Sequence, residues 1–428
     1  MGLYTLFGNG FWTEYEMRGG AWMRVRLAIL VALVFSISGA LVPGYSTHLQ
    51  KDLGFSPLEL SFCAATQGIA SLGAPLFGQI ADRILAPSLL MALSALGIFG
   101  AIGGLILSTS PIWVFVFTLL YWLLTIPTWV LATTMLFSHL DNPERDFGRT
   151  RMWGTIGWIA AGWSLVPLMS LGWVDQSKTI PFFCLAMVLA AIMGAFACTM
   201  PWVKPDHPPG RAFAPGAALK CLWSKPFFLY GICVFGICVS QPFSVQGTPL
   251  LLTELGLPRT WLLPSLTLAQ LPEAALSFIL PGILLRVGIK GSMRIGLIAW
   301  CVALSILSLS RSLWPALASL PLNGMVITLF LIVGSIWLNS RIPADLRTSA
   351  QAIVVFIQGL GMCLGHLSMG ILRGSMDLAS EAEELRLCFL VGAILNGALA
   401  ALFWWGFNPL RTQGHSFPQT SSRTPSAT

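Results

Sequence analysis

Apolar runs of about twenty residues recur along the whole chain, and they constrain its fold more than any other feature. Each run is long enough to cross a hydrocarbon core of roughly 30 Å as an α-helix. Inside a bilayer the backbone polar groups of such a run must pair with one another, which helices achieve. We therefore predict twelve transmembrane helices, at residues 26–49, 58–81, 88–108, 112–137, 151–173, 181–201, 227–252, 262–285, 293–309, 313–338, 349–372 and 387–407.

The composition supports this interpretation. Of the 428 residues 55% are hydrophobic and only 10% are charged, and the mean hydropathy is +0.77. So little polar surface excludes a soluble globular protein of this length and indicates a polytopic membrane protein. The nine cysteines are an odd number without a C-x-x-C pair. We interpret them as small apolar packing residues.

One long Pro- and Gly-rich segment interrupts the pattern at residues 202–225. Such a segment is typical of a linker between domains. It divides the chain into a six-helix half at 23–201 and a second six-helix half at 226–408, flanked by an N-terminal tail at 1–22 and a disordered C-terminal tail at 409–428. Two halves of equal helix number predict a pseudo-symmetric repeat transporter.

The basic residues predict the orientation of the chain. When the loops are assigned alternately to two sides, eighteen of the 24 Lys and Arg residues fall on the side that holds both ends and the middle linker. The positive-inside rule places this side in the cytoplasm. The formal charge of +7 then needs no nucleic-acid partner, because this bias and anionic lipid explain it.

An acid inside a predicted span points to a functional site. Glu273 lies in the apolar segment 268–282, and Gln270, three residues earlier, shares its helix face. Pro272 between them removes a backbone hydrogen bond and loosens the helix. Because an ionisable group at the bilayer centre costs roughly 2.5 to 3.5 kcal/mol on insertion scales, such groups normally face a bundle interior or a water-filled cavity.

A second polar stripe begins the fifth span. Arg151, Thr155 and Trp158 are spaced i, i+4, i+7 and share one helix face. A cation, a hydroxyl and a flat ring together suit a polar, planar ligand. The alternative is that Arg151 anchors the helix at the cytoplasmic interface and that Trp158 only packs. The residues alone leave both interpretations open.

Other polar residues within the spans allow the same two interpretations. Gln241 and Ser244 are three residues apart with a proline between them, which repeats the pattern of Gln270 and Glu273. Polar residues in membrane helices are more often interhelical hydrogen-bonding groups than ligand contacts. His366 is a further titratable residue within a span, and it is either a structural hydrogen-bonding residue or a proton site.

The loop after the second span carries the first family resemblance. Its segment Gly78-x-x-x-Asp82-Arg83 resembles the loop signature of the major facilitator superfamily, although Leu85, Ala86 and Pro87 replace the usual glycine and basic residues that follow. The resemblance implies a role for Gly78, Asp82 and Arg83 in conformational gating. On the residues alone, a solvated surface ion pair explains the two charges equally well.

The run Arg151-Met-Trp-Gly-Thr-Ile-Gly157 is closely similar to that of the nucleoside:proton symporters, a branch of the same superfamily. The similarity extends over roughly residues 24–409. It includes the segments Gln241-Pro-Phe-Ser244, Ala269-Gln270-Leu-Pro-Glu273, Val287-Gly-Ile-Lys290, Leu297-Ile-Ala-Trp300 and Arg347-Thr-Ser-Ala-Gln351. The resemblance implies that Arg151, Thr155, Trp158, Gln241, Ser244, Gln270 and Glu273 face a nucleoside.

The tenth span departs from the family pattern. Asn323, Ile327 and Thr328 stand where the family carries an aromatic pair and an acid. We add Asn323 to the predicted substrate-binding residues on this alignment. The change leaves Glu273 as the only acid well inside a span, and therefore as the only acidic candidate for proton coupling.

The resemblance implies a secondary active transporter of the cell (inner) membrane that imports nucleosides with protons by alternating access. The alternative is an uncoupled facilitator or an exporter of another small polar metabolite such as a sugar. We expect neither an enzyme nor a channel, because the spans carry no catalytic constellation, ring of like charge or filter loop. We expect a monomer in the lipid bilayer that needs no cofactor or metal.

Overall fold

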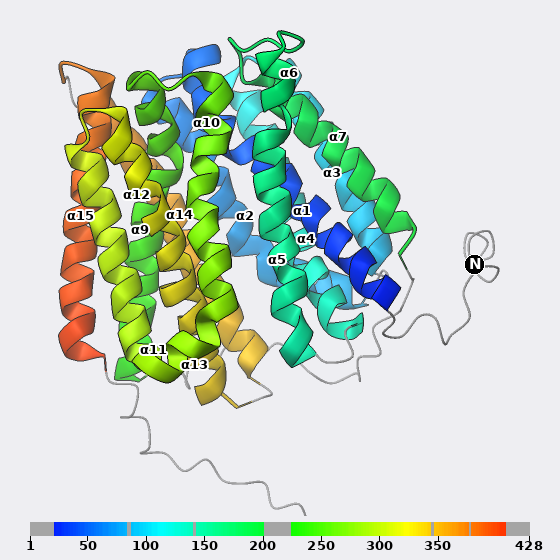
Figure 1. Cartoon of the computed structure of the whole chain (residues 1–428), viewed down its shortest axis with the longest axis vertical. Helices are drawn as coiled ribbons and strands as arrows, with labels where there is room; N and C mark the ends of the chain where they lie inside the picture. The colour runs from blue at the N-terminus through cyan, green and yellow to red at the C-terminus, as the bar shows by residue number, and fades with distance from the viewer. Residues whose placement is uncertain are drawn as a thin grey trace, which may run out of the picture.

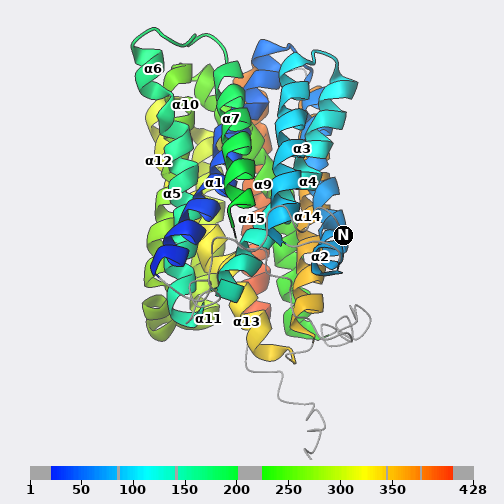
Figure 2. The same ribbon diagram turned by 90° about the vertical axis from the view of Figure 1, so that its right-hand side faces the viewer.

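The computed structural model describes residues 21–83, 87–139, 143–200, 224–343, 346–375 and 378–407. All regular elements in these ranges are helical. The long helices run side by side along the longest axis of the molecule (Figures 1 and 2). The all-helical membrane fold predicted from the apolar runs is thereby confirmed.

The first half begins most of its helices with proline. This residue fits the first helical turn, because its missing N–H would have no partner there and its φ angle is already helical. Its elements are α1 (Ala21–Thr47), the π-helical η1 (His48–Asp52), α2 (Pro57–Arg83), α3 (Pro87–Leu107), α4 (Pro111–His139), α5 (Pro143–Ser164), the short α6 (Val166–Ser170) and α7 (Ile180–Cys198).

The second half contains more interrupted helices. A 3₁₀ turn separates α10 from α11, and a π-helical segment separates α12 from α13. Its elements are α9 (Lys225–Glu254), α10 (Arg259–Leu266), η2 (Thr267–Ala269), α11 (Gln270–Leu309), α12 (Leu313–Val326), η3 (Ile327–Ile332), α13 (Val333–Arg341), α14 (Arg347–Ser375) and α15 (Glu381–Gly406).

The long element α11 contains two spans. Its 40 residues would extend about 60 Å if straight, twice the hydrocarbon thickness. Gly288 breaks it with φ 74° and ψ 170°, a conformation that only glycine adopts without strain. The chain therefore turns back at Gly288, between the predicted spans at 262–285 and 293–309.

Nine helices in the described part of the chain are long and apolar enough to cross a membrane. One of these, Arg259–Leu309, is the 51-residue run that turns back at Gly288. The helices α2 and α5 are not among the nine. The total of twelve spans therefore stays a prediction.

One predicted boundary needs correction. The fifth span was expected to run over 151–173, but α5 begins at Pro143 and ends at Ser164. Proline at the helix start moves Arg151 from the first turn into the interior of the helix. The linker at 202–225 and both predicted tails lie almost wholly outside the described residues, so these domain boundaries stay predictions.

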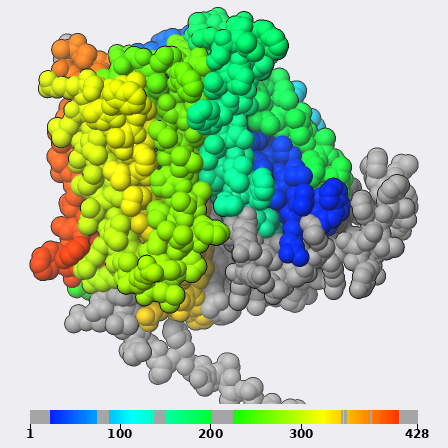
Figure 3. All heavy atoms as spheres, in the orientation of Figure 1, coloured from blue at the N-terminus to red at the C-terminus, as the bar shows by residue number. Residues whose placement is uncertain are grey.

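The two halves meet mainly where α2 packs on α14, α1 on α9, and α5 on α11, and α10 of the second half also contacts α1, α5 and α6. The neighbouring surfaces of α5 and α11 are visible in the space-filling view (Figure 3). At the α2–α14 contact, a Cβ on Gly68 would lie 2.5 Å from the backbone nitrogen of Cys363. Glycine is therefore required there for the halves to approach so closely.

The first turn of α1 and the last turn of α15 lie at the same end of the bundle (Figure 1). The opposite end holds η1, α6 and the start of α10, and we call it the η1 end. An even number of spans returns the chain to the side on which it began, so this arrangement agrees with the predicted topology.

Candidate functional site

The glycines of the α5 motif bring this helix against α1. A Cβ on Gly157 would lie 2.2 Å from the carbonyl oxygen of Ala32, so only glycine permits this contact. On the other side, a Cβ on Gly39 would lie 2.7 Å from the backbone of Trp158. Close packing of two backbones fixes the rotation of α5, and with it the direction of the predicted stripe.

Arg151 lies within this packed region and is half-buried. Its guanidinium carbon is 4.0 Å from the centre of the Phe35 ring. Phe35 in turn stacks on Trp129, with ring centres 5.5 Å apart. Gly154 leaves room for this arrangement, because a Cβ there would lie 2.8 Å from a guanidinium nitrogen of Arg151. The cation therefore rests on an aromatic wall formed by α1 and α4 of the same half.

The amino-acid sequence gives no signal for this aromatic wall. Phe35 and Trp129 lie in uninterrupted apolar spans, where nothing distinguishes a ring beneath a cation from a ring that faces lipid. The two rings can be recognised as a binding surface only from the position of Arg151, which belongs to α5.

In the second half, the predicted acid lies just after a break in its helix. The 3₁₀ turn η2 ends at Ala269, and α11 begins at Gln270, so Pro272 and Glu273 occupy its first turn. Gly324 of α12 packs directly on the break: a Cβ there would lie 2.2 Å from the carbonyl oxygen of Ala269. The loosened backbone predicted from Pro272 is therefore present. Irregular turns of this kind often mark functional sites in membrane helices.

Arg151 and Glu273 act on each other electrostatically across the boundary between the halves. Their helices, α5 and α11, are in contact. Glu273 is half-buried, like Arg151. A cation from one half and an anion from the other therefore lie within electrostatic reach of each other; that both face a nucleoside stays a prediction.

Two further contacts join elements of the second half at this place. The side-chain amide of Asn323 on α12 donates to the hydroxyl of Ser244 on α9 over 2.9 Å, while its oxygen is buried without a partner in the described part of the structure. The hydroxyl of Thr328, in the π-helical η3, donates to the carbonyl of Glu273 over 3.4 Å. Ser244 therefore makes an interhelical hydrogen bond, and its contact with a ligand stays a prediction.

The remaining predicted residues divide into two groups. Gln241 and Gln270 are half-buried and make no side-chain hydrogen bond to another described residue, so their amides are free for a ligand. Thr155 is buried and Trp158 is half-buried.

The surroundings of Gly78 and the side chains of Asp82 and Arg83, in the last turns of α2, lie outside the described part of the structure. Their gating role stays a prediction.

The site thus presents a cation on an aromatic wall, a carboxylate, and free or partly free amides. These groups can donate to and accept from a small polar ligand with a flat ring. No group of three or more His, Cys, Asp or Glu side chains suited to a metal ion occurs among the described residues. The polar groups come from α5, α9, α11 and α12, and both halves contribute.

The fold is that of a major facilitator transporter. A solved structure of a mutant of the nucleoside transporter NupG matches it with a TM-score of 0.79 at 20% sequence identity, covering 90% of this chain and all of that chain. A second NupG structure matches with a TM-score of 0.76 at 20% identity, over 89% of this chain and 98% of the other.

The family model described as "Nucleoside H+ symporter" matches residues 22–412, and the chain belongs to this family. It is 29% identical over 407 residues to YegT of Escherichia coli (strain K12), covering 88% of this chain and 92% of the relative. It is 24% identical over 409 residues to the xanthosine permease of the same organism, covering 90% and 95%. The resemblance drawn from the sequence motifs is therefore confirmed.

Proposed function

We propose that this protein is a secondary transporter that imports nucleosides together with protons by alternating access, from a site between its two halves. The observation that carries the proposal is the contact of α5 with α11, which brings Arg151 of the first half near Glu273 of the second. A ligand held by both groups links the halves, so its binding is coupled to their rocking. Membership of the symporter family supports the coupled ion.

Different side chains of the site would bind different parts of a nucleoside. Base edges and ribose hydroxyls offer both donors and acceptors, which the amides of Gln241, Gln270 and Asn323 match. Trp158 offers a flat surface beside them, and the hydroxyls of Thr155 and Ser244 complete the set. Ile327 and Thr328 provide no aromatic ring at the second half. We therefore assign stacking to the first half alone.

Glu273 is the proposed proton carrier. Desolvation disfavours the charged form of a carboxylate, whereas a nearby cation favours it. Because Arg151 belongs to the other half, movement of the halves changes this balance and alternately favours uptake and release of the proton. Substrate and proton binding are then linked reciprocally.

The test compares wild-type protein with Glu273→Gln in proteoliposomes. The amide keeps the size and much of the hydrogen bonding but cannot release a proton. Gradient-driven accumulation of labelled uridine or adenosine should vanish, while exchange of internal for external nucleoside persists. The matched control is wild-type uptake with and without an ionophore that collapses the pH gradient.

Uptake that is insensitive to the ionophore in the wild type would remove the symport proposal. The protein would then be an uncoupled facilitator, an alternative that Thr328 at the family's acidic position favours. The choice of substrate is tested in the same vesicles by offering a sugar or another polar metabolite, and preloaded vesicles test export. Accumulation of the sugar in place of both nucleosides would contradict the proposed substrate class.

The proposed location is the inner membrane, with a monomeric protein and both termini in the cytoplasm. The excess of Lys and Arg on the linker side supports this orientation. Cysteines introduced at Pro209 and Gln413 should be labelled from the same, cytoplasmic face. Labelling from opposite faces would contradict the orientation and the even number of spans.

A further inference from the structure

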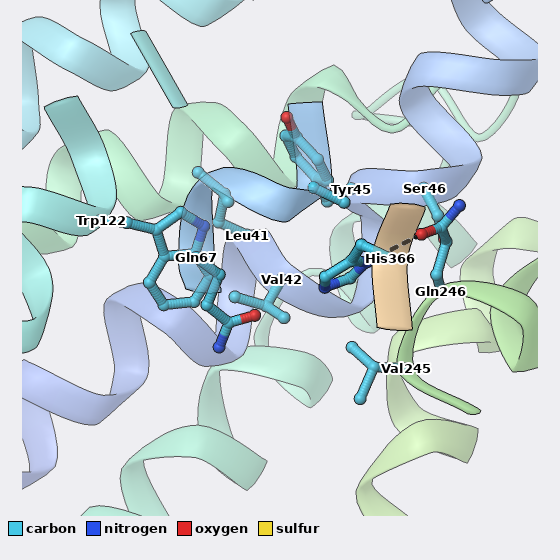
Figure 4. A pocket seen from close by; sticks show the side chains of 10 residues that line it. Leu41, Val42, Tyr45, Ser46, Gln67, Trp122, Val245, Gln246 and His366 are labelled. Carbon is cyan, nitrogen blue, oxygen red and sulfur yellow. Dashed lines mark hydrogen bonds between the residues drawn. The ribbon is translucent and has the colours of Figure 1, made fainter. Parts of the chain in front are cut away.

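A small pocket lies between the two halves, lined by α1, α2 and α4 of the first half and by α9 and α14 of the second (Figure 4). Its polar lining residues are Tyr45, Ser46, Gln67, Gln246 and His366. The cavity volume is about 30 Å³, and a water molecule needs about 10–15 Å³ by this measure. The pocket therefore suits one or two waters and is too small for a nucleoside.

His366 has a defined tautomer in this pocket. Its side chain is only 3% exposed. The amide nitrogen of Gln246 donates to the hydroxyl of Ser61 over 3.0 Å, so the amide oxygen is the atom that lies 2.9 Å from Nδ1 of His366. Since that oxygen can only accept, Nδ1 carries the hydrogen. In a neutral imidazole the lone pair is then on Nε2.

The Nε2 atom of His366 is buried without a hydrogen-bond partner in the described part of the structure, and so is the hydroxyl of Ser46. These two atoms belong to residues of α14 and α1, which line the same pocket from opposite halves. Buried polar atoms normally find a partner in protein or ordered water. A pocket of water size beside two such atoms points to a hydrogen-bond donor bound between the halves.

The charged and titratable groups around the pocket determine whether His366 can carry a proton there. Tyr45 on α1 is the only other titratable residue that lines it, and its hydroxyl is paired with Thr118 at 2.6 Å. No charged or titratable side chain lines the pocket from α2, α4 or α9. An imidazolium would therefore lack a counter-charge while the pocket is closed. Movement of the halves, which admits or excludes water, would govern whether His366 carries a proton.

We propose that His366 is a proton-binding site, separate from Glu273, that exchanges protons through Nε2 with water entering between the halves. The Nε2 lone pair takes a proton from hydronium and leaves water, and closure of the pocket favours the reverse step. The inference rests on the proposed proton-coupled function for its role in transport. The site itself follows from the pocket and the hydrogen-bond chain.

The first experiment observes the imidazole directly. The full chain, labelled with ¹⁵N-histidine in nanodiscs, should show a neutral Nδ1–H tautomer at neutral pH that becomes imidazolium as the solution is acidified, because water entering between the halves solvates the charged ring. The signal is assigned among five histidines by its loss in His366→Asn, or in His366→Gln if the first variant does not fold. A signal that stays neutral down to the lowest pH at which the protein remains folded, or that shows the opposite tautomer, would overturn the proposal.

The second experiment measures proton influx per nucleoside with a pH-sensitive dye inside liposomes. Asparagine can keep the donor to Gln246 but cannot titrate, so His366→Asn should lower the proton influx per nucleoside and keep nucleoside exchange. Cys363→Ala, one turn away on α14 and outside the pocket lining, is the matched control and should leave the influx unchanged. Unchanged influx in His366→Asn would exclude a role in coupling.

The two experiments also separate this inference from the proposed function. Wild-type protein that moves no protons would refute symport, whereas the NMR titration would still decide whether His366 binds a proton. Wild-type protein that couples normally with an untitratable His366 would refute only the present inference.

Discussion

The ion pairs at the η1 end and the charges of the central site are built from the same residue types but are partnered in opposite ways. At the η1 end, Asp52 accepts from His48 at 3.1 Å and from the backbone of Thr179 at 3.0 Å, and it also pairs with Arg259. In the central site Arg151 and Glu273 influence each other without such a set of bonds. The carboxylate of Asp52 thus has several partners from the protein, whereas the carboxylate of Glu273 has no hydrogen-bond partner among the described residues, as the proposed ligand site requires.

The ion pairs at the η1 end also join the halves. Asp52 belongs to η1 of the first half, and Arg259 begins α10 of the second. Arg259 further donates to the backbone carbonyl of Ser177, in the segment between α6 and α7. In that segment, hydrogen bonds from the hydroxyl and backbone of Ser177 hold the pKa of Asp175 below its usual value. We call Asp52, Arg259 and their partners the η1 clamp.

The contrast suggests that two parts of the bundle have different roles in alternating access. A clamp built on a carboxylate with several partners holds the halves together at one end, while the central groups stay incompletely paired until a ligand arrives. Breaking the clamp should therefore change the conformational equilibrium, whereas breaking the central site should change affinity. The predictions below test this division.

The largest effect is expected from Arg259→Ala. Breaking a buried ion pair costs about 3–5 kcal/mol and breaking a surface pair at most about 1 kcal/mol. Asp52 and Arg259 have side chains 8% and 21% exposed, so we expect about 2–3 kcal/mol, between these limits. The ratio of open to closed molecules at the η1 end should rise roughly 30- to 140-fold.

Spin labels at Thr109 and Ser312, on exposed loops of different halves, would report this opening as a longer distance population. Arg386→Ala is the control, because Arg386 donates to the carbonyl of Ser310 within the second half. If the two variants gave the same distance distribution, the η1 clamp would not hold the halves together.

The next effect is expected from Arg151→Ala in the central site. A lost hydrogen bond to a charged group is worth about 1.5–3 kcal/mol, so nucleoside affinity should fall roughly 10- to 150-fold. Binding calorimetry on purified protein measures it. The matched control is Arg294→Ala, which also removes a cation over a ring, here Trp404 at 3.9 Å. A similar loss of affinity in both variants would attribute the effect to general destabilisation.

A smaller effect is expected from Gln270→Ala. The amide is neutral, so its bond is worth about 0.5–1.5 kcal/mol, and affinity should fall roughly 2- to 12-fold. Gln351→Ala is the control, because Gln351 already bonds Asn339 and the carbonyl of Ser335 away from the site. Unchanged affinity in Gln270→Ala would make Gln270 a structural residue.

The amino-acid sequence pointed to the charged residues of the central site but not to those of the η1 clamp. Glu273 and Arg151 were found because charges inside apolar spans are conspicuous. Asp52, Arg259 and Lys51 lie at span ends, where charged residues are common and carry no signal until their partners are known. The apolar periodicity predicted the helices, but not the π-helical η1 that begins the clamp.

Hydrogen bonds between distant spans were equally invisible from the sequence. The link from Ser61 through Gln246 to His366 spans three helices. No local spacing distinguishes its members from other polar residues in membrane helices. For His366, the structure shows a structural hydrogen bond at Nδ1. Its Nε2 atom is buried without a hydrogen-bond partner in the described part of the structure.

The smallest effect is expected from Lys51→Ala, the neighbour of Asp52 in η1. Its ammonium lies 2.5 Å from Glu254 and 2.7 Å from Glu381, and the three side chains are 24%, 31% and 21% exposed. Such exposed pairs are worth at most about 1 kcal/mol and are screened by salt.

The same spin-label pair should therefore shift less than about fivefold in Lys51→Ala, and less still in high salt. If Lys51→Ala opened the η1 end as far as Arg259→Ala, closure of that end would depend on the total number of ion pairs there, and not on the η1 clamp alone. If it did not, the strength would come from the burial of Asp52. We expect the burial of Asp52 to determine the strength of the η1 clamp, because its single carboxylate accepts hydrogen bonds from both halves.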